Sequence, residues 1–164
     1  MKNIYTFNSA VEYALRCSIL LEASYPSSLS MQRMVYYDYL LTHSGDANGP
    51  ESIHLNIPNR ISEISIKREK IDGAMSLLCS KGLAKIIFNK EGISYIASDY
   101  TTPFLRELSS HYINQLKSIA LWVSDKFGKY TEDELTKYFN QNINRWGGEF
   151  ENASLLATER DINE

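Results

Sequence analysis

Apolar residues recur at helical spacing through the first third of the chain. The pattern predicts a first helix over Ser9–Ala23, which ends before Pro26 because proline has no amide N–H for the helix ladder. The same spacing predicts a second helix over Ser30–Leu41, with the serine as its N-cap. Asp38 shares the apolar face of this second helix, where a carboxylate needs a partner if it is buried.

The rest of the chain alternates loops with periodic segments. Glycine, proline and β-branched residues mark the boundaries. The predicted elements are, in order, a loop at 43–50, a short extended piece at 52–55, a short helix at 58–64, a longer helix at 65–81, a hairpin of 83–89 and 92–98, a long helix from 101 or 102 to 128 with a possible kink at Ser109-Ser110, and a last helix from the capping box at 131–134.

This order of elements favours a mostly α (α+β) fold, a winged helix-turn-helix with an N-terminal helix and additional C-terminal helices. The passage Leu77–Ile86, where a helix gives way to a hairpin through a glycine, is typical of that fold. We expect a winged-helix core with its long C-terminal helix in residues 1–128. A short helix and an acidic tail are expected in residues 129–164.

Composition and charge narrow the class of protein. The chain has 164 residues, 43% of them hydrophobic and 23% charged, which suits one soluble globular domain. Its net charge is −3, divided into +2 for residues 1–129 and −5 for 130–164. The basic excess is too small to coat nucleic acid, and the acidic end is interpreted as a mobile tail or as a segment that folds on a partner.

The cysteines and the N-terminal segment indicate a cytoplasmic protein. Cys17 and Cys79 form no CxxC pair or disulfide framework, which favours a reducing compartment. The first residues match neither a signal peptide nor a membrane span.

Motifs for catalysis are weak. No glycine-rich phosphate loop is present, so we expect no nucleotide hydrolysis, no cofactor and no metal. A carboxylate–histidine metal site from His43, Asp46, Glu51 and His54 is the enzymatic alternative. A triad of His43, Ser44 and Asp46 is disfavoured because such near neighbours cannot easily aim at one another.

The expected third helix and hairpin carry the cations of a possible nucleic-acid surface. These candidates are Arg60, Lys67, Arg68, Lys70, Lys85 and Lys90. Acidic residues are interleaved with them, so the pattern predicts weak, salt-sensitive contact. A stand-alone DNA-binding transcriptional regulator remains the alternative function.

One string of residues carries a family resemblance. Tyr37–Asp46, Tyr-Asp-Tyr-Leu-Leu-Thr-His-Ser-Gly-Asp, resembles the middle component of bacterial ABC-three-component systems. The resemblance continues through 49–54, 67–69, 81–83 and 122–128, and it covers roughly residues 10–135.

The resemblance implies a non-enzymatic adaptor. Middle components are encoded beside an SMC-like or ABC-type ATPase and an effector, commonly a nuclease, as in the Lamassu anti-phage systems and their plasmid-eliminating relatives. Such an adaptor bridges the two and helps to restrain the effector until foreign DNA is sensed. DNA is then contacted indirectly, through the complex.

The same string is the predicted partner interface. Adjacent tyrosines cannot all face one core, so some are expected to be exposed or covered by another chain. The predicted interface residues are Tyr36, Tyr37, Asp38, Tyr39, His43, Ser44, Gly45, Asp46 and Trp122. Two alternatives stay open: the string only builds the domain, and the long helix with Trp122 packs onto the first helix.

Overall fold

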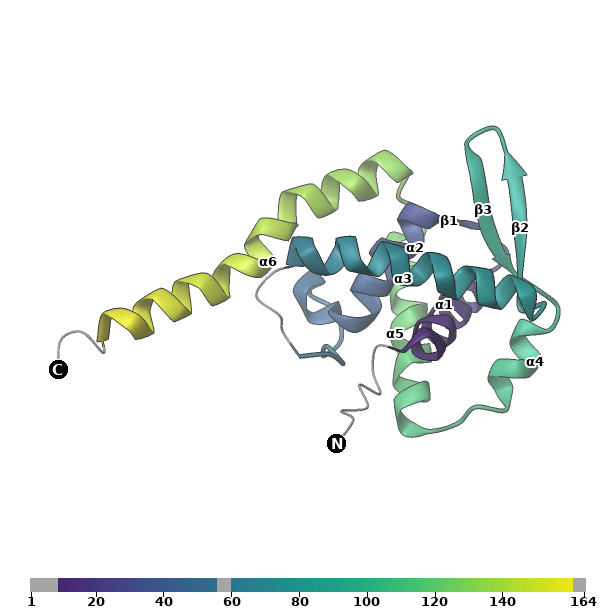
Figure 1. Ribbon diagram of the computed structural model, residues 1–164, viewed down its shortest axis with the longest axis horizontal. Coiled ribbons are helices and arrows are strands. Elements are labelled where there is room, and N and C mark those ends of the chain that lie inside the picture. The colour runs from purple at the N-terminus through teal and green to yellow at the C-terminus, as the bar shows by residue number, and fades with distance from the viewer. Residues whose placement is uncertain (1–8, 56–59, 161–164) are drawn as a thin grey trace.

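Three helices form the centre of the computed structural model, which describes residues 9–55 and 60–160, with backbone alone after Trp146. They are α1 (Ala10–Ser24), α2 (Met31–Thr42) and α3 (Arg60–Ser80), and α1 packs between α3 and α5 (His111–Phe127) (Figure 1). The hydroxyls of Ser9 and Ser30 cap α1 and α2, each accepting the N–H three residues on. Both predicted helix starts are confirmed.

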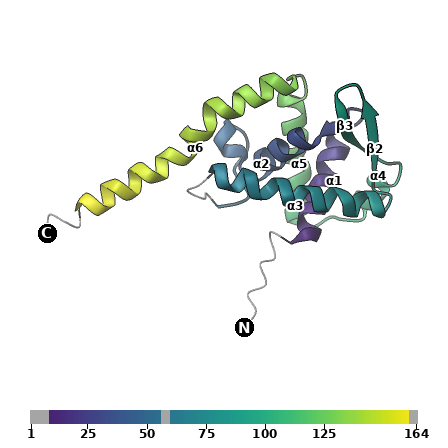
Figure 2. The same cartoon turned by 45° about the horizontal axis from the view of Figure 1, so that its top comes forward.

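A three-stranded antiparallel sheet lies at one end of these helices. Its strands are β1 (Leu29–Ser30), β2 (Ala84–Asn89) and β3 (Gly92–Ala97), in the order β1-β3-β2. The predicted hairpin is confirmed as β2–β3, and it projects from the body of the molecule (Figures 1 and 2). The strand predicted at 52–55 is wrong: that segment is irregular, and Leu29–Ser30 pairs with β3 instead.

The third helix is one continuous element. Residues 60–80 form α3 without the boundary that the sequence placed between residues 64 and 65, so that prediction is wrong. Arg60 and Lys67 lie on its buried side and interrupt the apolar periodicity that identifies a helix. The predicted start at Pro58 lies outside the described residues.

The long helix expected after the hairpin is two helices. They are α4 (Thr101–Arg106) and α5, and the hydroxyl of Ser110 caps α5 by accepting the N–H of Ile113. Ser109-Ser110, which was expected to kink a single helix, therefore lies in the connection between α4 and α5.

The last helix is longer than expected. α6 (Glu132–Arg160) begins with the predicted capping box, in which Thr131 and Glu134 bond each other's backbone N–H. It continues through Gly147-Gly148, so the acidic tail is helical to Arg160, and this end extends beyond the body (Figure 2). Near its start, Phe139 stacks on Tyr36 with ring centroids 4.0 Å apart. The first half of α6 therefore shares the hydrophobic core with α2.

The cysteines and the helix lengths bear on where the protein works. Cys17 and Cys79 are both free thiols. Among the helices of the described residues, none is both long and apolar enough to cross a membrane.

Candidate functional site

Asp38 on α2 is the centre of a buried group of charges. Its carboxylate accepts hydrogen bonds from Arg16 of α1, at 2.6 Å from Nε and 3.1 Å from Nη2. Nζ of Lys67, from α3, donates to it at 2.7 Å. All three side chains are buried, so one carboxylate ties three helices together without contact to solvent.

Asp38 and Arg16 stay charged because each stabilises the charge of the other. Burial alone would raise the pKa of Asp38, but the attraction of Arg16 and Lys67 outweighs it and holds this pKa well below its usual range. Burial likewise opposes the charge of Arg16, and the attraction of Asp38 outweighs it and raises the pKa. Loss of Asp38 would leave two buried cations without their shared counter-charge.

The group extends on one side toward the turn after α2. Nζ of Lys67 lies 3.7 Å from Glu63, whose Oε1 lies 2.9 Å from Nε2 of His43. Arg60 bridges the next pair, with Nη1 3.7 Å from Glu63 and Nη2 3.3 Å from Asp46. The buried cations of α3, Arg60 and Lys67, are therefore matched by acidic groups on α2, on α3 itself and on the turn at Ser44–Ala47.

Further contacts close both ends of this ion network. The Tyr39 hydroxyl donates to Asp46 at 2.5 Å. At the opposite end, Glu12 accepts from Arg16 at 3.4 Å and from the hydroxyl of Tyr112 on α5. We call this connected set the ion network; its members are Glu12, Arg16, Asp38, Tyr39, His43, Asp46, Arg60, Glu63, Lys67 and Tyr112.

The predicted partner interface lies mostly inside the chain. Its buried members are Tyr36, Tyr37, Asp38, Tyr39, His43 and Ser44, while Gly45 is exposed and Asp46 half-buried. The expectation that some of the tyrosines are exposed is wrong, because α1, α3, α5 and α6 surround α2 on several sides and consecutive residues all meet a neighbour. The burial supports the alternative that this string builds the domain.

Trp122, the remaining member of that predicted interface, holds the loop after α2 against α5. A Cβ on Gly49 would lie only 2.3 Å from the indole ring, so glycine is what allows this contact. Nζ of Lys126, one turn further along α5, donates to the carbonyl oxygen of Ala47 at 2.6 Å. The indole is half-buried by this contact within the chain.

The metal-site alternative finds little support in the geometry. His43 faces Glu63, Asp46 is taken by Arg60, and three cations of the ion network lie close by. Burial, followed by repulsion from Arg16 and Lys67, lowers the pKa of His54 to about 4. In the part of the chain that the structure describes, no three His, Cys, Asp or Glu side chains are arranged to hold a metal ion.

The predicted nucleic-acid surface loses two of its six cations. Arg60 and Lys67 are buried in the ion network and cannot reach a phosphate, so these two predictions are wrong. Four remain exposed: Arg68, Lys70, Lys85 and Lys90. Arg68 donates to Gln32 at 2.8 Å, and Lys85 lies 3.7 Å from Asp99.

The hairpin exposes apolar side chains for which the sequence pattern predicted no function. Ile86, Phe88 and Ile93 are 44%, 78% and 54% exposed, and Phe88 lies directly opposite Ile93. The signal in the sequence was Lys-Ile-Ile-Phe-Asn, a strand without the polar alternation of a half-buried sheet. Clustered exposed apolar side chains mark interaction sites.

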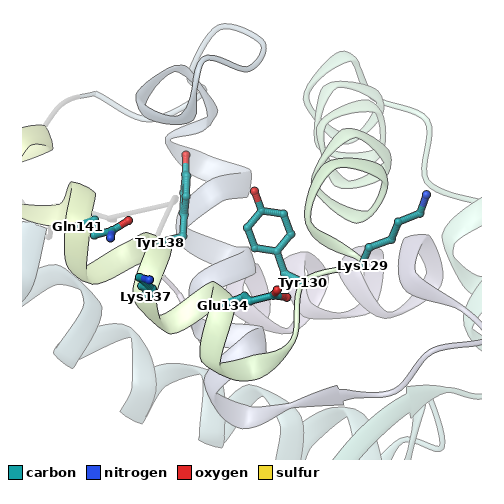
Figure 3. Close-up of a pocket in the computed structure, with 6 residues that line it drawn as sticks. All are labelled: Lys129, Tyr130, Glu134, Lys137, Tyr138 and Gln141. Carbon is teal, nitrogen blue, oxygen red and sulfur yellow. The ribbon is translucent and has the colours of Figure 1, made fainter.

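A second surface feature is a hollow at the junction of α5 and α6. Its volume is about 500 Å³, and its lining residues are Lys129, Tyr130, Glu134, Lys137, Tyr138 and Gln141 (Figure 3). The rings of Tyr130 and Tyr138 meet edge to face at 6.2 Å, and their hydroxyls point the same way. Glu134 stays negatively charged while it accepts from the Thr131 N–H, and with Lys129 and Lys137 the lining of the hollow has a net charge of +1.

The fold and the site define a small, mostly helical α+β protein with ion pairs in its core and an uncovered apolar hairpin. A family model described as ABC-three component (ABC-3C) system Middle Component 2 matches residues 6–149. The chain belongs to this family and is a component of an ABC-three-component system, which confirms the resemblance at the level of the family. Comparisons with curated proteins and with solved structures found no match.

Proposed function

We propose that this middle component is a non-enzymatic adaptor that joins an SMC-like or ABC-type ATPase to an effector nuclease. The complex acts in bacterial defence against phage or plasmids, as in the Lamassu design, and the adaptor restrains the effector until foreign DNA is sensed. It works in the cytoplasm without a cofactor, and it contacts DNA only through the complex.

The observation that carries this proposal is the exposed apolar hairpin. Phe88 and Ile93 form a cross-strand pair at its end, and both are more than half exposed. Such side chains are costly to leave in water, and a partner subunit that covers them recovers about 25 cal/mol for each Å² buried. An adaptor also needs a second, different surface, and the hollow between Lys129 and Gln141 offers aromatic and basic groups for it.

The element order supports a winged helix-turn-helix interpretation of the core. In this interpretation α3 is the third helix, β2–β3 is the wing, and the strand between the first two helices completes a sheet of order β1-β3-β2. A wing that binds DNA presents cations to phosphates. This wing presents isoleucine and phenylalanine, which favours a protein partner.

The stand-alone transcriptional regulator is the less favoured function. It needs several free cations on α3, yet Arg60 and Lys67 are committed to the core. Arg68 and Lys70 remain beside Glu69 and Asp72, so the helix presents mixed charge to a duplex.

Assembly and effector activity test the proposal together. The tagged chain is produced with the ATPase and effector components encoded beside it, and the mass of the purified assembly is measured by light scattering. We expect one complex that contains all three, and a nuclease that is active on DNA when the chain is omitted. An ATPase and an effector that bind each other equally well without the chain, or an effector that is equally silent without it, would contradict the adaptor role.

A further inference from the structure

The outer edge of β2 is open. In the order β1-β3-β2, the described residues place a neighbouring strand on one side of β2 only. The hairpin closes with a two-residue turn at Lys90-Glu91, next to the pair Asn89–Gly92. In an antiparallel hairpin with such a turn, every second residue bonds the neighbouring strand, starting from the pair next to the turn. Asn89 and Ile87 therefore bond β3, while the backbone N–H and C=O groups of Ile86 and Phe88 point away from it.

Lys85, near the start of β2, is the one charged side chain in this strand that could guard the edge against another strand. Natural edge strands are usually guarded by lysine or other charges, by proline or by a bulge, and the apolar run Ile86–Phe88 has none of these. The six residues of β2 include no proline, and their register with β3 is unbroken from Ala84 to Asn89. The strand also projects from the body, so a second chain can reach it (Figure 1).

The side chains of β2 specify what an added strand must carry. Ile86 and Phe88 lie on one face and Ile87 on the other, all of them exposed. Lys85 and Lys90 bracket this apolar run, and both are exposed as well. The contact of Lys85 with Asp99 joins two highly exposed side chains, and such surface pairs are weak enough to exchange partners.

We propose that an extended segment of a partner subunit adds to β2 as a fourth strand of the sheet. Its apolar residues cover Ile86, Ile87 and Phe88, and acidic residues at its two ends pair with Lys85 and Lys90. The main chain supplies affinity through the open N–H and C=O groups, and the side chains supply specificity. This inference rests on the proposed adaptor function and names how one of its two partners binds.

The charges favour a partner subunit over a second copy of this chain. Two copies of β2 that pair through Ile87 would place Lys85 of each copy beside Asn89 and Lys90 of the other. That arrangement gathers four lysines around one pair of strands, and like charges on adjacent strands are destabilising. A partner segment with acidic residues at its two ends would instead pair with these lysines and avoid that repulsion.

Two variants and one control test the added strand in the complex of the three components. Phe88→Lys places a charge at the apolar edge, and Ile86→Pro removes one outward N–H while it keeps an apolar side chain. Leu121→Lys introduces the same charge at a residue of α5 that is 61% exposed. We expect each β2 variant to weaken assembly about tenfold or more, and the control to change it by less than about twofold.

Amide hydrogen exchange of the unmodified protein gives an independent measurement. On assembly, the exchange of the Phe88 amide should slow about tenfold or more, while the Ile87 amide, which faces β3, changes little. This measurement decides the question even if a β2 variant folds poorly.

The outcomes separate the two proposals. A complex that forms normally with both β2 variants, with unchanged exchange at Phe88, overturns the added strand and leaves the adaptor function intact. A chain that forms no complex with the other components overturns the adaptor function, and the added strand with it. A dimer of this chain alone that Phe88→Lys converts to a monomer shows that a second copy occupies the edge, which overturns the proposed occupant.

Discussion

Buried charges are the feature that most distinguishes individual residues of this protein. The sequence predicted that Asp38, on an apolar helix face, needs a partner, and the structure confirms it. It could not name Arg16 and Lys67, because these lie 22 and 29 residues away and meet Asp38 only after three helices have packed. The expectation of exposed tyrosines was wrong for a related reason: sequence spacing does not reveal how many elements surround a helix.

Asp38→Asn tests the ion network directly. The substitution leaves Arg16 and Lys67 buried without their counter-charge, so we expect the free energy of unfolding at pH 7 to fall by about 3–5 kcal/mol. The control Asp125→Asn, at an exposed residue of α5, should change it by less than about 0.5 kcal/mol. Urea unfolding measures both.

The effect of Asp38 also has a pH window. Its pKa is lowered in the folded protein, so its stabilisation is complete above the unfolded value of about 4 and is lost as the pH falls further. The difference in the free energy of unfolding between wild type and Asp38→Asn should therefore shrink in strong acid. A difference that stays constant down to pH 2 would contradict this account.

His54 gives a second pH dependence, in a milder range. Burial, with Arg16 and Lys67, lowers its pKa from 6.5 to about 4, so the unfolded chain binds this proton first as the pH falls. The free energy of unfolding should decrease between pH 6.5 and 4, by up to about 3 kcal/mol from this residue. We expect His54→Asn to flatten the slope and His111→Asn, at an exposed histidine, to retain it. Equal slopes in the two variants would assign the pH dependence to other groups.

At the scale of elements, the sequence predicted most helices and the hairpin because their caps and turns are local. Ser9, Ser30 and the box at Thr131–Glu134 cap as expected. The failures have non-local causes. β1 has only two residues, too few for a periodic signal, and exists because β3 lies beside it.

The loop after α2 depends on one glycine. Gly49→Ala forces the Trp122 ring to move from a 2.3 Å contact, so we expect a loss of about 1–3 kcal/mol in the free energy of unfolding. Gly73→Ala in α3 is the matched control, since nothing lies within 4 Å of its added Cβ. This change should stabilise the protein by up to about 1 kcal/mol, because alanine favours a helix interior. Variants that shift the urea midpoint in the same direction would contradict the contact.

For the whole molecule, the sequence predicted the fold class and the family but not which surfaces are free. Whether a lysine faces a phosphate or a carboxylate depends on packing, and Lys67 is an example of a cation lost to the core. The apolar residues of β2 were visible in the sequence, yet a strand of that composition is also typical of a buried one. Their exposure follows from the position of the hairpin at the end of the sheet.

Weak binding to DNA is the corresponding expectation for the isolated chain. With Arg60 and Lys67 buried, we expect dissociation constants of about 10⁻⁴ to 10⁻⁶ M at physiological salt, with no preference among duplex sequences. Fluorescence anisotropy with a labelled duplex measures this, and the affinity should fall steeply as salt rises. Nanomolar, sequence-dependent binding would favour the transcriptional regulator instead.

The three-way pairing of Asp38 with Arg16 and Lys67 also constrains how this protein can evolve. Replacing all three charges with apolar side chains of similar volume can be neutral or stabilising, whereas a core in which one of these charges is left unpaired is strongly destabilised. The positions lie in three different helices, so a lineage that leaves this arrangement by single substitutions must pass through a much less stable intermediate. Substitutions at these three distant positions are therefore coupled in evolution, even though none of the three side chains reaches the solvent.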